Sequence, residues 1–167
     1  MKGCCQAGHG KPELRQEGRF MQRKLLIIGA GGHGKIVADA AEQLARWDRI
    51  EFIDERYPEK HTNAHWPVVG TMADLAEMTL EQSDLFIAVG ANRTLPQLIE
   101  QCRQFGCPLP PIIHPTAYIS RYATLGESTF IAAHAVVQTD ARLGAGVIVN
   151  TGASVDHDCV LDDGVHV

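Results

Sequence analysis

The sequence of 167 residues predicts an α/β, Rossmann-like domain followed by a parallel β-helix. The β-helix is predicted by two patterns: from residue 113 onward an aliphatic residue returns every six positions, and a small or compact residue follows each of the first nine by four positions. The Rossmann-like domain is predicted by an apolar run, a glycine turn and an amphipathic stretch within residues 24–46. The aliphatic series is Ile113, Ile119, Leu125, Ile131, Val137, Leu143, Val149, Val155, Leu161 and Val167.

A period of six matches neither the 3.6-residue period of an α-helix nor the alternation of a simple strand, and it is typical of hexapeptide-repeat β-helices. We expect the aliphatic residues to stack inside the coil. Three hexads form one coil, so residues 113–166 supply about three coils and Val167 begins a fourth. A β-helix needs a cap over its last apolar layer, and none follows Val167, so we expect the chain to be truncated relative to a longer design. The compact residues of the second series are Ala117, Ala123, Thr129, Ala135, Ala141, Val147, Ala153, Cys159 and Val165.

The N-terminal part alternates buried apolar runs with amphipathic stretches, which favours an α/β domain with a parallel sheet. We expect this domain to cover residues 21–110 and the β-helix to cover 111–167. Residues 1–20 are glycine-rich and without period, so we expect a disordered or non-native leader, with translation starting at Met1 or Met21. The expected elements are a strand at 24–28, a glycine turn at 29–34, a helix at 35–46, a strand at 50–53, a polar loop to Pro67, a short helix capped by Thr71, a strand at 85–89, and a helix from its cap Thr94 through Phe105, closed by Gly106.

The glycine turn carries a dinucleotide-binding pattern. Gly29, Gly31 and Gly34 satisfy G-x-G-x-x-G, and Asp54 lies about twenty residues further on, at the end of the next strand. Free N–H groups at a helix N-terminus attract an anion, which makes a nucleotide the natural ligand. A tight turn without a ligand and a solvated Asp54 are the alternatives. An NAD-dependent oxidoreductase is less favoured, because a β-helix stands where its substrate domain would be.

Composition excludes several classes of partner. The net charge of −5 gives no electrostatic reason to bind nucleic acid or an anionic membrane. No apolar run approaches the roughly 18 residues of a membrane-spanning helix. The five cysteines form no C-x-x-C pair, which favours a reduced, cytoplasmic compartment. No metal site is predicted.

Several segments together resemble the PglD/NeuD family of sugar acetyltransferases. The resemblance covers about residues 24–167 and implies homotrimers in which the N-terminal domain holds a nucleotide sugar. It also implies that the left-handed β-helix binds acetyl-CoA between neighbouring subunits. The segments that carry the resemblance are Ile27 to Lys35 (IIGAGGHGK), Phe52 to Glu55 (FIDE), Ile87 to Arg93 (IAVGANR), Ile113 to Pro115 (IHP) and Asn150 to Cys159 (NTGASVDHDC).

The resemblance assigns a role to single residues. It implies that His157 is the general base, with Asp158 raising its basicity, and that His166 contacts acetyl-CoA. Such a histidine suits the reaction, because an amine or hydroxyl must lose a proton as it attacks a thioester and imidazole titrates near neutral pH. Without the flanking motif, His157 would be interpreted as a polar residue on an exposed turn. The implied contacts of the nucleotide sugar are the backbone of Gly31, Gly32 and His33, then Asp54 and Glu55 at the nucleoside, and Gly90 beside the sugar.

Other candidates outside this set are interpreted structurally: His134 as a surface or interface residue, His114 as part of the domain junction, and Cys159 as packing. The predicted function is therefore acetyl transfer from acetyl-CoA to an amino or hydroxyl group of a nucleotide-activated or nonulosonic sugar, that is, a UDP-amino sugar or sialic acid. The alternative is a trimeric module that binds a nucleotide sugar without catalysis. The sequence leaves open the identity of the sugar and the choice between N- and O-acetylation.

Overall fold

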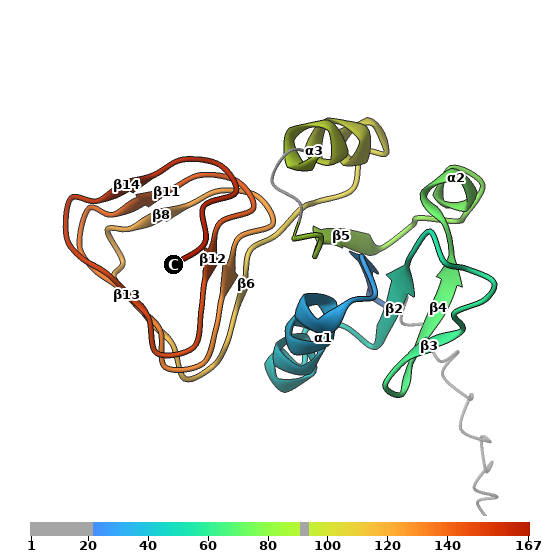
Figure 1. Cartoon of the computed structure of the whole chain (residues 1–167), viewed down its shortest axis with the longest axis horizontal. Helices are drawn as coiled ribbons and strands as arrows, with labels where there is room; N and C mark the ends of the chain where they lie inside the picture. Colours follow the sequence, from blue (N-terminus) through green and yellow to red (C-terminus); the bar gives the residue numbers. More distant parts are fainter. Residues whose placement is uncertain (1–21, 91–93) are drawn as a thin grey trace, which may run out of the picture.

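The computed structural model describes residues 22–90 and 94–167, and it contains two domains packed side by side (Figure 1). The predictions of a leader at 1–20 and of a start at Met21 lie outside the described residues. The elements of the N-terminal domain are β1 (Lys24–Ile28), α1 (Gly32–Leu44), β2 (Arg49–Ile53), β3 (Thr62–Asn63), β4 (Trp66–Gly70), α2 (Met72–Leu75), β5 (Ser83–Ile87) and α3 (Leu95–Gln104).

The five strands form one sheet in the order β3-β4-β2-β1-β5. The central strand β1 pairs in parallel with β2 and β5, and its apolar residues are buried on both faces, as expected for a parallel sheet covered by helices. One face packs against α1 through Leu25, Ile27 and Phe52. The opposite face packs against α2 and α3 through Leu26 and Ile28. This arrangement brings the carboxyl ends of β1, β2 and β5 to one edge (Figure 1).

Two predicted element bounds were wrong, and one hairpin was missed. Helix α1 begins at Gly32 and ends at Leu44, because the glycines occupy its first turn, where N–H groups need no partner within the helix. The expected strand 85–89 is shifted to Ser83–Ile87. The expected polar loop contains the hairpin β3–β4, which makes the sheet mixed because β3 runs antiparallel to β4. Pro67 concealed β4 from sequence reasoning, although the side chains on either side of it are buried.

Two helix signals were confirmed. Thr71 forms a capping box with Asp74 at the start of α2, and Gly106 adopts a positive φ of 69° just after α3. Both signals depend only on neighbouring residues.

The β-helix consists of two-residue parallel strands in three coils, which stack into three sheets. The second residue of each strand belongs to the predicted aliphatic series, and the members of both predicted series other than Thr129 and Val167 form one internal core. Positive φ values also return every six residues, at Ser128, His134, Asp140, Gly146, Gly152, Asp158 and Gly164. A bridge between Ile148 and His166 begins the next coil. The strands are β6 (Ile112–Ile113), β7 (Tyr118–Ile119), β8 (Thr124–Leu125), β9 (Phe130–Ile131), β10 (Val136–Val137), β11 (Arg142–Leu143), β12 (Ile148–Val149), β13 (Ser154–Val155) and β14 (Val160–Leu161).

The two domains share a hydrophobic interface. Ile112, Phe130 and Ile148, the first residues of β6, β9 and β12, belong to the same core cluster as Val37 of α1. The sheet β12-β9-β6 therefore faces the N-terminal domain (Figure 1). The corner between the other two sheets, which contains residues 156–159, consequently lies on the far side of the coil. The predicted α/β domain and β-helix are confirmed.

Candidate active site

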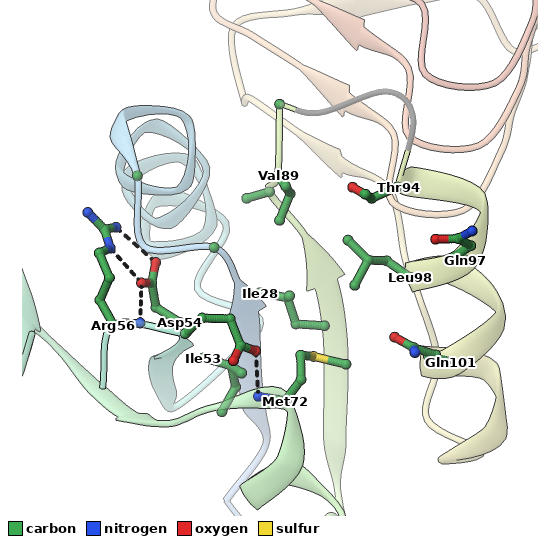
Figure 2. A pocket seen from close by; sticks show the side chains of 15 residues that line it. Ile28, Ile53, Asp54, Arg56, Met72, Val89, Thr94, Gln97, Leu98 and Gln101 are labelled. Carbon is green, nitrogen blue, oxygen red and sulfur yellow. Dashed lines mark hydrogen bonds and ion pairs between the residues drawn. The ribbon is translucent and has the colours of Figure 1, made fainter. Parts of the chain in front are cut away.

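A cleft of about 590 Å³ opens at the carboxyl ends of β1, β2 and β5, between the first turn of α1 and α3 (Figure 2). Gly31, Asp54, Glu55 and Gly90, four of the six predicted nucleotide-sugar contacts, line it. Gly32 and His33 do not line it. Sequence reasoning missed Arg56, Met72, Gln97 and Gln101, which also face this space. The structure thus gathers residues from five separate segments around one concave site at the carboxyl ends of the strands, where α/β folds bind ligands.

The glycines of the turn, together with Gly90 after β5, divide into two groups. Gly29 has a φ of 105°, and a Cβ on Gly34 would lie 2.1 Å from the carbonyl oxygen of Gly29, so the fold itself requires both glycines. A Cβ on Gly31, Gly32 or Gly90 would meet no atom within 4 Å. The fold leaves space beside these three, which permits a ligand to approach the backbone closely.

The N-terminus of α1 is not capped by its own side chains. Gly31 is the N-cap residue, with no side-chain hydrogen bond to the first turn, and that turn carries no acidic residue. Ser or Asp at this position would satisfy one of the free N–H groups. The sequence instead leaves these donors and the positive end of the helix dipole beside the cleft, an arrangement suited to a phosphate.

Asp54 fixes the position of this turn. Its Oδ2 accepts a hydrogen bond from the backbone N–H of Ala30 at 2.7 Å. The guanidinium of Arg56 donates from Nε to Oδ1 at 2.7 Å and from Nη2 to Oδ2 at 3.0 Å (Figure 2). The Arg56 hydrogen bond is the main cause that holds the pKa of Asp54 well below its usual range, so the carboxylate stays ionised. A basic residue two positions after the strand-end acid was the available sequence signal for Arg56.

The loop after β2 also holds the carbonyl groups of the turn. Arg56 Nη2 donates to the Ala30 oxygen at 3.3 Å, and the Lys60 ammonium donates to the same oxygen. Asn63 donates to the Gly31 oxygen at 3.1 Å. Glu55 accepts a hydrogen bond from the Met72 N–H at 3.2 Å, at the start of α2. The contacts of Arg56, Lys60 and Asn63 direct the carbonyl groups of the turn toward the loop after β2, which leaves the N–H groups of the turn for an anion.

His33 lies at the boundary between the domains. Its ring meets the ring of Phe130 edge to face, with centroids 5.4 Å apart. Burial, and secondarily the charge of His166, lower the pKa of His33 to about 4. His166 is exposed and continues the column of Ile148 on the sheet that faces the N-terminal domain. The structure therefore brings two predicted site residues together from opposite ends of the chain.

His157 and Asp158 form the predicted pair at the far corner of the coil. His157 Nδ1 and Asp158 Oδ2 are 2.7 Å apart, and both side chains are largely exposed. This hydrogen bond, followed by the charge of Asp158, raises the pKa of His157. The hydrogen bond on Nδ1 leaves Nε2 directed elsewhere. The turn between β13 and β14 that carries the pair thus lies across the β-helix from the N-terminal domain (Figure 1).

The remaining candidates have structural surroundings. The ring of His114 hydrogen-bonds Thr116, His134 is exposed on a turn, and Cys159 packs at the edge of the internal core. Among residues 22–90 and 94–167, no three His, Cys, Asp or Glu side chains cluster in a way that could hold a metal ion. In the same ranges no helix is long and apolar enough to cross a membrane.

Comparison with known proteins identifies the family. Residues 24–102 match the model of the PglD N-terminal domain. The acetyltransferase domain of PglB from Neisseria gonorrhoeae FA1090, solved in complex with acetyl coenzyme A, is 45% identical, with a TM-score of 0.81 over 87% of this chain and 70% of that chain. This chain belongs to the PglD family. The predicted resemblance is thereby confirmed.

Two further PglD-like relatives differ in the nucleotide sugar that their names contain. UDP-N-acetylbacillosamine N-acetyltransferase from Bacillus subtilis (strain 168) is 34% identical over 112 residues, which are 66% of this chain and 52% of the relative. PerB from Caulobacter crescentus, solved with CoA and GDP-perosamine, is 32% identical, with a TM-score of 0.77 over 86% of this chain and 67% of that chain. The chain spans about half the length of the Bacillus relative that it matches.

Proposed function

We propose that this PglD-family chain transfers an acetyl group from acetyl-CoA to an amino group of a nucleotide-activated sugar, with His157 as the general base. The observation that carries the proposal is the 2.7 Å contact between His157 Nδ1 and Asp158 Oδ2. A carboxylate in this position fixes the tautomer of the imidazole and stabilises the imidazolium that forms when the base takes a proton.

The proposed reaction needs one proton transfer. The sugar nitrogen forms a bond to the thioester carbonyl carbon, the C–S bond breaks, and CoA leaves with the electron pair of that bond. His157 Nε2 takes the proton that the nitrogen loses and returns it to the CoA sulfur. Asp158 keeps Nδ1 protonated throughout. Cys159 takes no part, because its side chain packs at the edge of the core of the coil.

The cleft supports a nucleotide sugar as the acceptor. The free N–H groups at the first turn of α1 suit a diphosphate, and the open space beside Gly31 and Gly90 permits its close approach. Free sialic acid has no diphosphate to use these donors, which favours a UDP-amino sugar over it. The PglD-like relatives named above are an N-acetyltransferase and a protein solved with GDP-perosamine, which favours an amino over a hydroxyl acceptor.

Acetyl transfer then requires a second subunit. The cleft and His166 lie on one side of the β-helix, whereas His157 lies on the corner opposite the N-terminal domain. Exposed apolar side chains surround this corner: Tyr122 is 64% exposed and Val160 is 68% exposed. We propose a homotrimer in which the His157 corner of one chain meets the cleft of its neighbour, with acetyl-CoA between the two β-helices and His166 in contact with it.

Release of CoA from acetyl-CoA in the presence of UDP-amino sugars tests the activity. We expect turnover by the 167-residue chain and a loss of about 10² to 10⁴-fold in His157→Ala, the usual contribution of general-base catalysis. His134→Ala is the matched control, because His134 is another exposed histidine on a turn of the same β-helix. Full activity in His157→Ala would contradict the assignment. UDP-sugar binding without turnover in the unmodified chain would favour the alternative of a binding module.

Mixed trimers test the shared site. Gly31→Val blocks the cleft and His157→Ala removes the base, so each variant alone is expected to be nearly inactive. Co-refolded mixtures contain sites that combine an intact cleft with an intact His157, and we expect up to about a quarter of the activity to return in an equimolar mixture with random assembly. A mixture as inactive as its components would place both groups of each site in one chain.

A further inference from the structure

One end of the cleft faces away from the β-helix and is lined by α2 and α3. Gln97 and Gln101 lie one turn apart on α3 and point into the cleft (Figure 2). Leu95, at the start of α3, lies against the β-helix, because a Cβ on Gly146 would be 2.6 Å from its side chain. Gln101 is almost two turns further along and therefore lies farther from the β-helix. Met72, from α2, lies at the same end of the cleft (Figure 2).

The proposed function determines which end of the cleft receives the nucleoside, and the inference that follows rests on it. The diphosphate lies at the first turn of α1, in the middle of the cleft. The sugar must extend toward the β-helix, where acetyl transfer takes place, which is the side of Gly90. The nucleoside consequently extends the other way, toward Met72 and Gln101.

We propose that Gln97 and Gln101 bind the edge of a uracil base, while Met72 and Leu98 contact its faces. Each amide offers both a donor and an acceptor, and the edge of uracil presents acceptor, donor and acceptor in turn. The apolar side chains supply surfaces for the ring.

Guanine is the less suitable base. Its adjacent N1–H and N2–H₂ donors are best met by a free carboxylate, which accepts with both oxygens. Asp54 accepts from Ala30 and Arg56 with both of its oxygens, and Oε1 of Glu55 accepts from the Met72 N–H, which holds the Glu55 carboxylate at the start of α2. Among the described residues, the amide pair on α3 supplies uncharged donors and acceptors at this end, and these match uracil.

The test measures binding of UDP and of ribose 5-diphosphate, which lacks the base, by calorimetry with the 167-residue chain. We expect the unmodified chain to bind UDP at least ten times more tightly. Gln97→Ala and Gln101→Ala should each weaken UDP binding about five- to tenfold, the usual effect of a lost hydrogen bond, and leave ribose 5-diphosphate binding unchanged. Gln104→Ala is the control, because Gln104 is on the same helix, exposed, and outside the cleft.

The outcomes separate this inference from the function on which it rests. UDP binding that is equal in the unmodified chain and both glutamine variants would overturn the role of the amides. Tighter binding of GDP than of UDP would overturn the choice of uracil. If no nucleoside diphosphate binds to the unmodified chain, the proposed nucleotide-sugar function fails, and this inference fails with it. Alanine at exposed helical positions favours the helix, so loss of folding is not expected in either variant.

Discussion

His166 of the β-helix lies close enough to His33 of the glycine turn for its charge to help lower the pKa of His33 to about 4. Burial against the interface is the larger cause, and the edge-to-face contact with Phe130 places the His33 ring there. A neutral His33 is therefore part of the interface between the domains.

This relationship predicts a loss of stability in acid. The unfolded chain protonates His33 near pH 6.5, whereas the folded chain keeps it neutral to about pH 4. The contribution of the neutral His33 to the free energy of unfolding is therefore complete above pH 6.5. It decreases by roughly 3 kcal/mol in all as the pH falls toward 4. Urea unfolding at pH 7.5 and pH 5 should show the decrease. His33→Gln should reduce the loss of stability between pH 7.5 and pH 5, and His134→Gln should not. An equal loss of stability in all three proteins would contradict the prediction.

His157 and Asp158 predict the pH dependence of activity. His157 must be neutral to accept a proton, so kcat/KM should rise with pH through the raised pKa of His157. Asp158→Asn removes the main cause of the raised pKa, so the acidic limb should move to lower pH while the maximal rate falls. The measurement is the pH profile of kcat/KM in both proteins. If the acidic limb of the profile does not shift in Asp158→Asn, a group other than His157 controls that limb.

Asp54 predicts a coupled effect on stability and binding. Asp54→Ala leaves the N–H of Ala30, a fully buried residue, without its acceptor, which should cost about 1–3 kcal/mol in the free energy of unfolding. The turn should also lose its fixed position, and UDP binding should weaken. Thermal unfolding and calorimetry measure the two effects. Arg56→Gln, which changes a largely exposed side chain, should cost at most about 1 kcal/mol in stability; a larger loss than in Asp54→Ala would reverse the assigned roles.

Substitutions at Gly31 and Gly34 should have opposite effects on stability, although both residues lie in one turn. Gly31→Ser supplies the missing side-chain N-cap, so stability should stay equal or rise by about a few tenths of a kcal/mol, the usual difference between Ser and Gly at this position. The new hydroxyl competes for the free N–H groups, and UDP binding should fall at least tenfold. Gly34→Ala forces a Cβ to within 2.1 Å of a backbone oxygen and should destabilise the fold by about 3 kcal/mol. Chemical unfolding measures the stability of the two variants, and a UDP titration measures their binding. Undiminished UDP binding in Gly31→Ser would exclude a phosphate at this turn.

Sequence reasoning succeeded where structure depends on local periodicity. The hexad from Ile113 onward determined the β-helix and its internal core, because every repeat must bury the same kind of side chain. The hairpin β3–β4 was missed, since Pro67 and a polar stretch concealed two buried side chains, Trp66 and Val68, that only packing against β2 and α1 explains.

The sequence by itself determined the two domains, their family and the residue types available for chemistry. Only the tertiary structure decided which of those residues meet. It paired Asp54 with Arg56, placed Gln97 and Gln101 on one wall of the cleft, and brought His33 beside His166. It also separated His157 from the cleft of its own chain. The meeting of His33 with His166 depends on how one sheet of the β-helix packs against α1, and contacts between distant segments leave no periodic signal in the sequence.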